Sequence, residues 1–109
     1  MFRGVTDMAD ASVDMAKMQE SATKAALLLK AMSNESRLMI LCHLGSQEMS
    51  VTELNDNIHL SQSSLSQHLA RLRSDGLVKT RRESQTIYYS LANDVVMKLI
   101  TVLQNEFCS

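Results

Sequence analysis

The chain has 109 residues and a mass of 12.2 kDa, which leaves room for one domain with a modest hydrophobic core. Eleven basic and twelve acidic side chains give a net charge of -1, which excludes a nonspecific polycation. No apolar run approaches the roughly 20 residues that a membrane-spanning helix needs, and the N-terminal stretch MFRGVTDMADAS lacks the apolar core of a signal peptide. We therefore expect a cytoplasmic protein with no membrane partner.

The N-terminal region divides into an arm and a helix. Residues 1–12 show weak periodicity and are predicted to form a flexible arm, so the predicted domain covers residues 13–109. From residue 15 onward, apolar side chains follow the a and d positions of a heptad repeat, and the central alanines would let a second helix approach closely. These positions are Met15, Met18, Ala22, Ala25, Leu29 and Met32.

The segment Asn34–Gly45 is the next predicted helix, with Asn34 or Ser33 as its N-cap. Arg37 has two open interpretations: contact with a phosphate, or a brace to a neighbouring helix. The predicted inward positions are Leu38, Leu41 and Leu44.

Two short helices joined by a tight turn are predicted after residue 50. Ser50 and Glu53 form a capping box at the first start, and Ser61 is placed as the N-cap of the second helix. Two helix starts eleven residues apart leave space for little more than a turn. This spacing predicts a helix-turn-helix of the kind that reads DNA.

The second of these helices has an apolar side and a polar side. Leu65, Leu69 and Leu72 recur at helical spacing and must face inward. The opposite side carries short hydroxyls and amides, which suit hydrogen bonds to base edges in the major groove, and no acid occurs between residues 60 and 74. The predicted DNA-reading residues are Gln62, Ser63, Ser64, Gln67, His68 and Arg71.

A β-hairpin is predicted directly after the reading helix. Gly76 suits a left-handed helix C-cap, and the alternating stretch LVKTRRESQTIYYSL predicts two strands about a turn near Glu83 and Ser84. Leu77, Ile87, Tyr89 and Leu91 are expected to face the body of the protein. The residues predicted to contact the DNA backbone are Lys79, Arg81, Arg82 and Gln85. The predicted fold is therefore mainly α-helical with a small β-hairpin wing, a winged helix-turn-helix.

A second apolar stripe follows an N-cap at Asn93 and comprises Val96, Leu99, Ile100, Leu103 and Phe107. A monomer of this size could bury one such stripe fully, whereas burying both is harder. Two interpretations stay open: both stripes pack on the domain's own core, or they form a dimer interface.

The combination of LLKAMSNESRLMIL, VTEL, LSQSSLSQHLARLRSDGLV and RRESQTIYY resembles the ArsR/SmtB family of small dimeric bacterial regulators over about residues 15–108. The resemblance implies a homodimer through the first and last helices, and two reading helices about 34 Å apart on double-stranded DNA would match a near-palindromic operator. Within the family, Cys42 and Cys108 make the chain most similar to the HlyU-like branch. This resemblance implies either a repressor or an activator that competes with a nucleoid silencing protein.

The two cysteines allow two interpretations. Taken alone, Cys42 could be a small core side chain and Cys108 an incidental terminal thiol. Similar members of this branch carry cysteines at both places and are regarded as dithiol switches. The resemblance therefore implies a Cys42/Cys108 redox switch that senses oxidants or reactive sulfur and modulates DNA affinity.

Other functional classes are less well supported. The family's metal-site patterns are missing here: ELNDNIHL has no cysteine and NDVVMKLITVL has no histidine, so no metal or other cofactor is predicted. No nucleophile turn, paired carboxylate site or phosphate-binding glycine loop points to an enzyme. The remaining alternatives are a winged helix used for protein contact and a metal-responsive repressor.

Overall fold

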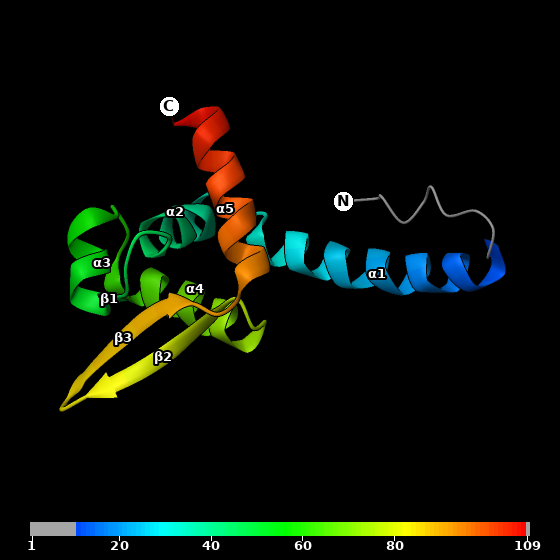
Figure 1. The fold of residues 1–109 in the computed structure, drawn as a ribbon. Helices are drawn as coiled ribbons and strands as arrows, with labels where there is room; N and C mark the ends of the chain where they lie inside the picture. The colour runs from blue at the N-terminus through cyan, green and yellow to red at the C-terminus, as the bar shows by residue number, and fades with distance from the viewer. Residues whose placement is uncertain (1–10, 109) are drawn as a thin grey trace. The chain divides into compact units, whose positions relative to one another are not determined.

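The computed structural model describes residues 11–108, and the side chains from residue 14 onward. It is mainly helical with one small antiparallel sheet, and it has the predicted winged-helix fold (Figure 1). None of the described helices combines the length and apolarity that crossing a membrane requires. The elements in chain order are α1 (Ala11–Met32), α2 (Glu35–Leu44), β1 (Met49–Ser50), α3 (Val51–Asn57), α4 (Gln62–Ser74), β2 (Val78–Glu83), β3 (Thr86–Leu91) and α5 (Asp94–Phe107).

Helix α1 contributes most of the first of two units, residues 1–30, and the second unit covers residues 31–109. Of the predicted arm, residues 1–10 lie outside the described part of the chain, and residues 11 and 12 are helical. On the predicted heptad stripe, Met15, Met18 and Leu29 are exposed. This apolar face of α1 is the one for which the family resemblance implies a dimer interface.

In the second unit, the N-cap of α2 is Asn34, one of the two predicted candidates, and its side chain accepts a hydrogen bond from the Arg37 backbone nitrogen. Ile40, Leu41 and Leu44 are buried. Arg37 is itself 9% exposed, and its Nε donates to the Ala31 carbonyl at 2.6 Å. Of its two interpretations, the structure shows the brace.

The sheet has the strand order β1-β3-β2, with antiparallel neighbours throughout. The two-residue strand β1 was not predicted, because two residues are too few to show an alternating pattern. It pairs Met49 with Tyr89 and Ser50 with Tyr88. Leu91 is buried as expected, but Ile87 is 40% exposed and its predicted inward packing is wrong, since it lies near the hairpin tip, beyond the core.

Helix α5 begins after Asn93, whose side chain accepts from the Val96 backbone nitrogen at 3.1 Å. Val96 and Ile100 are fully buried in the second unit, so this part of the predicted stripe packs on the domain's own core. The exposed apolar side chains of α5 include Val95 and Val102, seven residues apart and on one side of the helix. An α5 interface with a partner would therefore use a neighbouring face of the helix.

Candidate nucleic-acid interface

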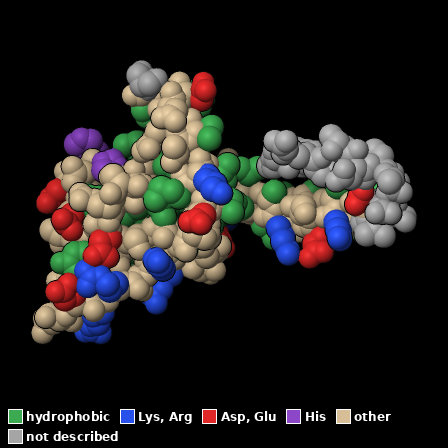
Figure 2. All heavy atoms as spheres, in the orientation of Figure 1, with side chains coloured by type: hydrophobic (Ala, Val, Ile, Leu, Met, Phe, Trp, Pro, Cys, Tyr) green, Lys and Arg blue, Asp and Glu red, His purple; other side chains and the backbone are tan. Residues whose placement is uncertain are grey.

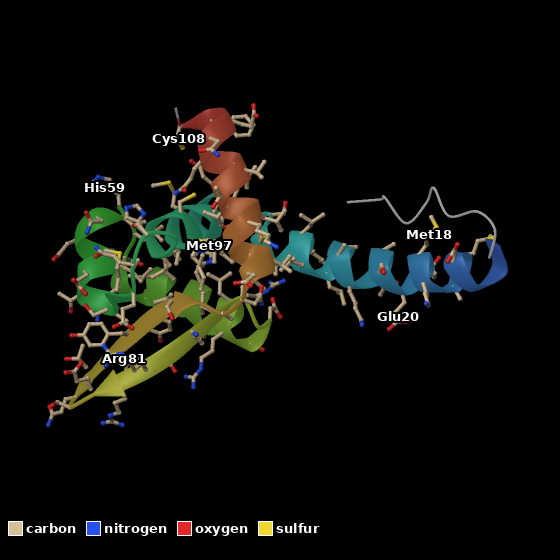
Figure 3. The ribbon with its side chains drawn as sticks, viewed as in Figure 1. Met18, Glu20, His59, Arg81, Met97 and Cys108 are labelled. Atoms are coloured by element: carbon tan, nitrogen blue, oxygen red, sulfur yellow. The ribbon has the colours of Figure 1, made fainter. Side chains whose placement is uncertain are left out.

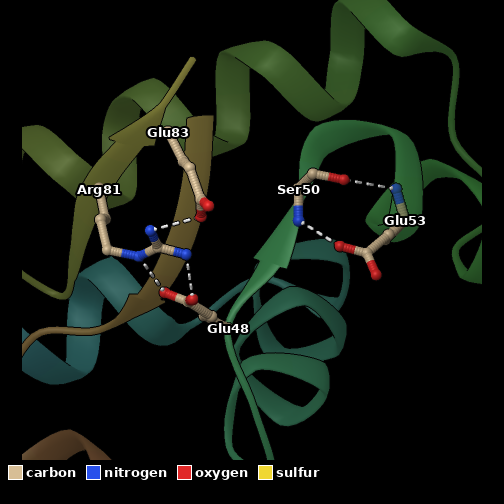
Figure 4. Close-up of polar contacts among 5 residues, drawn as sticks. All are labelled: Glu48, Ser50, Glu53, Arg81 and Glu83. Carbon is tan, nitrogen blue, oxygen red and sulfur yellow. Dashed lines mark hydrogen bonds and ion pairs between the residues drawn. The ribbon is translucent and has the colours of Figure 1, made fainter. Parts of the chain in front are cut away.

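The helix-turn-helix forms with the predicted caps. The Ser50 hydroxyl accepts from the Glu53 backbone nitrogen at 3.2 Å, and the Glu53 carboxylate accepts from the Ser50 nitrogen at 2.9 Å (Figure 4). At α4, the Ser61 hydroxyl accepts from the Ser64 backbone nitrogen at 3.1 Å and donates to the Ser64 hydroxyl. A backbone nitrogen in the first turn of each helix is thus hydrogen-bonded locally by the N-cap side chain. Residues 58–61 separate α3 from α4.

Helix α4 holds its polar side outward because its leucines anchor the other side. Leu65, Leu69 and Leu72 are each 1% exposed or less. Of the predicted reading residues, Ser64 and His68 are half-buried. The four others are exposed, namely Gln62, Ser63, Gln67 and Arg71. The structure therefore places these six side chains along one helix, and both amides are among the exposed ones.

Gly76 ends this helix as predicted, with φ at +79°. Its nitrogen donates to the Arg73 carbonyl at 3.1 Å, and the Leu77 nitrogen donates to the Leu72 carbonyl at 2.9 Å. These two bonds form a Schellman motif, which turns the chain directly from α4 into β2. Because β2 and α4 are in contact, the wing is held beside the reading helix.

Arg71 pairs with an acid that was not among the predicted site residues. Arg71 Nε donates at 3.2 Å to the carboxylate of Asp75, the C-cap of α4. Asp75 lies one residue beyond the acid-free stretch, and the i,i+4 spacing could have indicated the pair. Arg71 is therefore shared between an intramolecular contact and any contact with DNA. Among the described residues, none forms a hydrogen bond or ion pair with the Gln67 side chain.

The basic residues of the wing lie on both faces of the hairpin. Side chains alternate along a strand, so Lys79 and Arg81 lie on one face and Arg82 on the other, across from Ile87. Figure 2 shows basic and acidic side chains next to each other on this hairpin. The basic residues predicted to contact the DNA backbone therefore do not form one cluster.

Arg81 is engaged within the molecule. Its Nη2 and Nε donate to the two carboxylate oxygens of Glu48 at 2.6 and 3.2 Å, and its Nη1 donates to Glu83 at 2.9 Å (Figure 4). The guanidinium also lies over the Tyr88 ring, 4.8 Å from its centroid. The hydrogen bond from Arg81 lowers the pKa of Glu48 below its usual value, and the hydrogen bonds to Glu48 and Glu83 raise the pKa of Arg81.

The turn of the wing contains two residues, Ser84 and Gln85, because Glu83 pairs with Thr86. Ser84 adopts φ of 57°, a region that favours glycine, and its carbonyl accepts from Arg82 Nε at 3.1 Å. The side chains of Lys79, Arg82 and Gln85 are exposed.

The two cysteines lie on α2 and directly after α5, and both are free thiols. Cys108 is exposed at the end of α5, far from the hairpin that carries Arg81 (Figure 3), and Cys42 is half-buried in α2. Gln104 Nε2 donates to the Cys42 carbonyl at 3.2 Å, which ties the end of α5 to α2. Burial raises the pKa of the Cys42 thiol, and the charge of Cys108 raises it further. The two thiols are therefore within electrostatic range of each other.

An open hollow of about 390 Å³ adjoins Cys42, lined also by His43, Gln47, Asn57 and Gln104. Its lining supplies one thiol and one imidazole, and elsewhere in residues 11–108 no three His, Cys, Asp or Glu side chains gather as metal ligands would. The described part of one chain therefore offers no metal centre.

Comparison with known proteins gives similarities to bacterial transcription regulators in both sequence and structure. Residues 34–80 match the family described as "Bacterial regulatory protein, arsR family". The chain is 50% identical over 98 residues to the transcriptional activator HlyU of Vibrio cholerae serotype O1, covering 90% of this chain and 91% of HlyU. It is 41% identical to the biofilm growth-associated repressor of Agrobacterium fabrum, covering 89% and 83% of the two chains. The structure of reduced HlyU from Vibrio cholerae N16961 is 52% identical, with a TM-score of 0.82 over 85% of this chain and 98% of that one.

Proposed function

This chain belongs to the ArsR family of bacterial regulatory proteins, and on that premise we propose that it controls transcription by binding double-stranded operator DNA as a homodimer in the cytoplasm. Its family makes it a transcription regulator and not an enzyme, and its relatives include the HlyU and BigR proteins. Both the predicted family and the predicted HlyU-like branch are confirmed. We propose, in addition, operator binding, a homodimer and a dithiol switch.

The single observation that carries DNA reading is the outward polar side of α4. Three fully buried leucines fix the helix, so Gln62, Ser63 and Gln67 present amides and a hydroxyl to the surroundings. Gln suits bidentate hydrogen bonds to adenine, and short side chains let a helix enter the major groove. We assign base contacts to the outward side of α4, which also carries Ser64, His68 and Arg71. We assign contacts with the DNA backbone to the wing residues Lys79, Arg82 and Gln85.

The dimer would be formed by the exposed apolar faces of α1 and α5. Met15, Met18 and Leu29 lie exposed on α1, and Val95 and Val102 on α5. Two copies related by a twofold axis would present two α4 helices to successive major grooves, about 34 Å apart. The operator would accordingly be near-palindromic.

We further propose that Cys42 and Cys108 form a dithiol switch in which Cys108 reacts first. Cys108 is exposed, whereas burial keeps Cys42 protonated, and the thiolate is the reactive form. A peroxide would oxidise the Cys108 thiolate to a sulfenic acid and release hydroxide. The Cys42 thiol would then displace water and form a disulfide. A sulfane sulfur donor would instead transfer its outer sulfur to the Cys108 thiolate and leave as a thiolate, and the Cys42 thiol would displace hydrogen sulfide from the resulting persulfide to form the same disulfide.

Such a bond would join α2 to the end of α5, where Gln104 already contacts Cys42. Because α5 carries part of the proposed dimer face, the bond would change the relative placement of two distant α4 helices. Support for redox sensitivity also comes from a solved relative, which is described as reduced HlyU.

The sign of regulation follows from operator position, and the relatives include both an activator and a repressor by name. An activator of this kind would act by competing with a nucleoid silencing protein, whereas a repressor would block transcription directly.

The experiment that tests this proposal is recovery of bound fragments from genomic DNA with reduced and oxidised protein in parallel. We expect reduced protein to enrich near-palindromic sites and oxidised protein to enrich them less. The variant Cys108→Ser should give the same sites under both conditions. If no sequence is enriched by reduced protein, specific DNA binding is wrong; if enrichment is equal in both states, the switch alone is wrong.

A further inference from the structure

Arg81 differs from the other basic residues of the wing because all of its donor nitrogens face protein carboxylates. Two nitrogens bind both oxygens of Glu48, and the third binds Glu83. Lys79 and Arg82 are exposed, and neither forms an ion pair with a carboxylate of the described chain. A cation already paired with two carboxylates attracts a phosphate less than an unpaired one does.

Glu48, which pairs with Arg81, lies directly before the helix-turn-helix in the chain. Glu48 directly precedes β1, and Ser50, two residues later, is the N-cap of α3. The same segment pairs with the wing through Ser50 and Tyr88, and the Tyr88 ring lies under the Arg81 guanidinium (Figure 4 shows the ion pairs). Arg81 therefore joins strand β2 to the chain segment from which the helix-turn-helix begins.

The contact has more bonds than an ordinary surface ion pair, because three nitrogens of one guanidinium bind two carboxylates. A single exposed pair adds little, whereas a bidentate arginine in a network with a second carboxylate and an aromatic ring is held in one geometry. The separation of 33 residues between Arg81 and Glu48 also means that the contact restrains tertiary structure.

From this geometry we propose that Arg81 is a positioning residue, which fixes the wing relative to the helix-turn-helix through Glu48, and that it is not itself a phosphate contact. Its consequence for DNA rests on the proposed function. Lys79 and Arg82 then supply the phosphate contacts of the wing, and Arg81 determines where these side chains lie.

Glu48→Asp keeps the charge but shortens the side chain, and it distinguishes a positioning role of Arg81 from a phosphate contact. If Arg81 contacts phosphate, loosening its bond to Glu48 leaves DNA binding unchanged or stronger. If Arg81 is a positioning residue, Glu48→Asp and Arg81→Gln both weaken operator binding, roughly two- to five-fold, without changing the slope of log affinity against log salt. Lys79→Gln is the matched control and should reduce that slope by about one. The proposal is overturned if Arg81→Gln reduces the slope as Lys79→Gln does, or if Glu48→Asp binds as well as or better than the unaltered protein.

A measurement on the protein without DNA tests the positioning separately. Amide hydrogen exchange over residues 81–88 should be faster in Arg81→Gln and Glu48→Asp than in the unaltered protein, and unchanged in Lys79→Gln. Unchanged exchange in the first two variants would refute the restraint, whether or not the protein binds DNA. Absence of DNA binding by the unaltered protein, with faster exchange in these variants, would refute the proposed function and leave the restraint confirmed.

Discussion

Single side chains on α4 and the wing differ in their intramolecular contacts, and this determines what each is free to bind. Gln67 is exposed and has no hydrogen bond or ion pair to another described residue, whereas Arg71 is shared with Asp75. Arg82 is exposed on the wing, on the opposite face from Arg81. Gln67 and Arg82 are therefore the best probes of base reading and of backbone contact.

Replacing Gln67 by Ala should cost about 1 to 3 kcal/mol of binding free energy on the selected operator and little on random duplex, because base-edge hydrogen bonds are lost. Replacing Arg82 by Ala should weaken both duplexes alike, since a phosphate contact carries no sequence information. Fluorescence anisotropy titrations on the two duplexes measure both effects. Identical behaviour of the two variants would contradict the assignment.

The thiols should differ in reactivity with iodoacetamide. A raised pKa means that Cys42 is protonated at neutral pH and becomes a thiolate only as the pH rises through that higher value. Cys108 should therefore be alkylated first at pH 7, and the Cys42 rate should keep rising at higher pH, as followed by mass spectrometry of peptides. Faster alkylation of Cys42 at pH 7 would contradict Cys108 as the first nucleophile.

Among the secondary-structure elements, those set by local contacts were predictable from sequence. The caps at Asn34, Ser50, Ser61 and Asn93 each involve residues three apart, so a short motif reveals them. The strand β1 and the contact of Arg81 with Glu48 depend on segments that meet only after folding. The wing residues could therefore be identified as basic, but their division between two faces and the pairing of Arg81 could not.

The junction between α4 and β2 depends on the left-handed conformation of Gly76. A Cβ there would have no atom within 4 Å, so Gly76→Ala tests backbone strain alone. The free energy of unfolding should fall by about 1 to 2 kcal/mol, as measured by denaturant titration. Gly76→Asn is the control and should lose less, because Asn tolerates this conformation. Equal loss in both variants would point to a cause other than the backbone angle.

At the scale of the whole molecule, the proposed dimer determines whether two reading helices can act together. Val102 is 58% exposed on the α5 face that the core leaves uncovered. Val102→Glu should therefore shift the protein toward monomer in analytical ultracentrifugation, since a charge would be buried at the interface. Ile87→Glu, a similar change on the wing, should leave the association unchanged. A Val102→Glu protein that associates as tightly as the unaltered one would exclude this face.

The charge of the whole chain is nearly balanced, so affinity for DNA must come from where the cations lie. Five of the eleven basic side chains fall within residues 71–82, on the last turns of α4 and on β2. A protein of this net charge that used the same surface for a protein partner would bind with little dependence on salt.

The most direct measurement is the affinity of the reduced, unaltered protein for a selected operator duplex as a function of salt concentration. Because several phosphates are neutralised on binding, we predict a steep linear fall of log affinity with log salt, and clear preference for the operator over random duplex at every concentration. A shallow slope, or no binding to any duplex at low salt, would contradict the account that the outward side of α4 reads DNA.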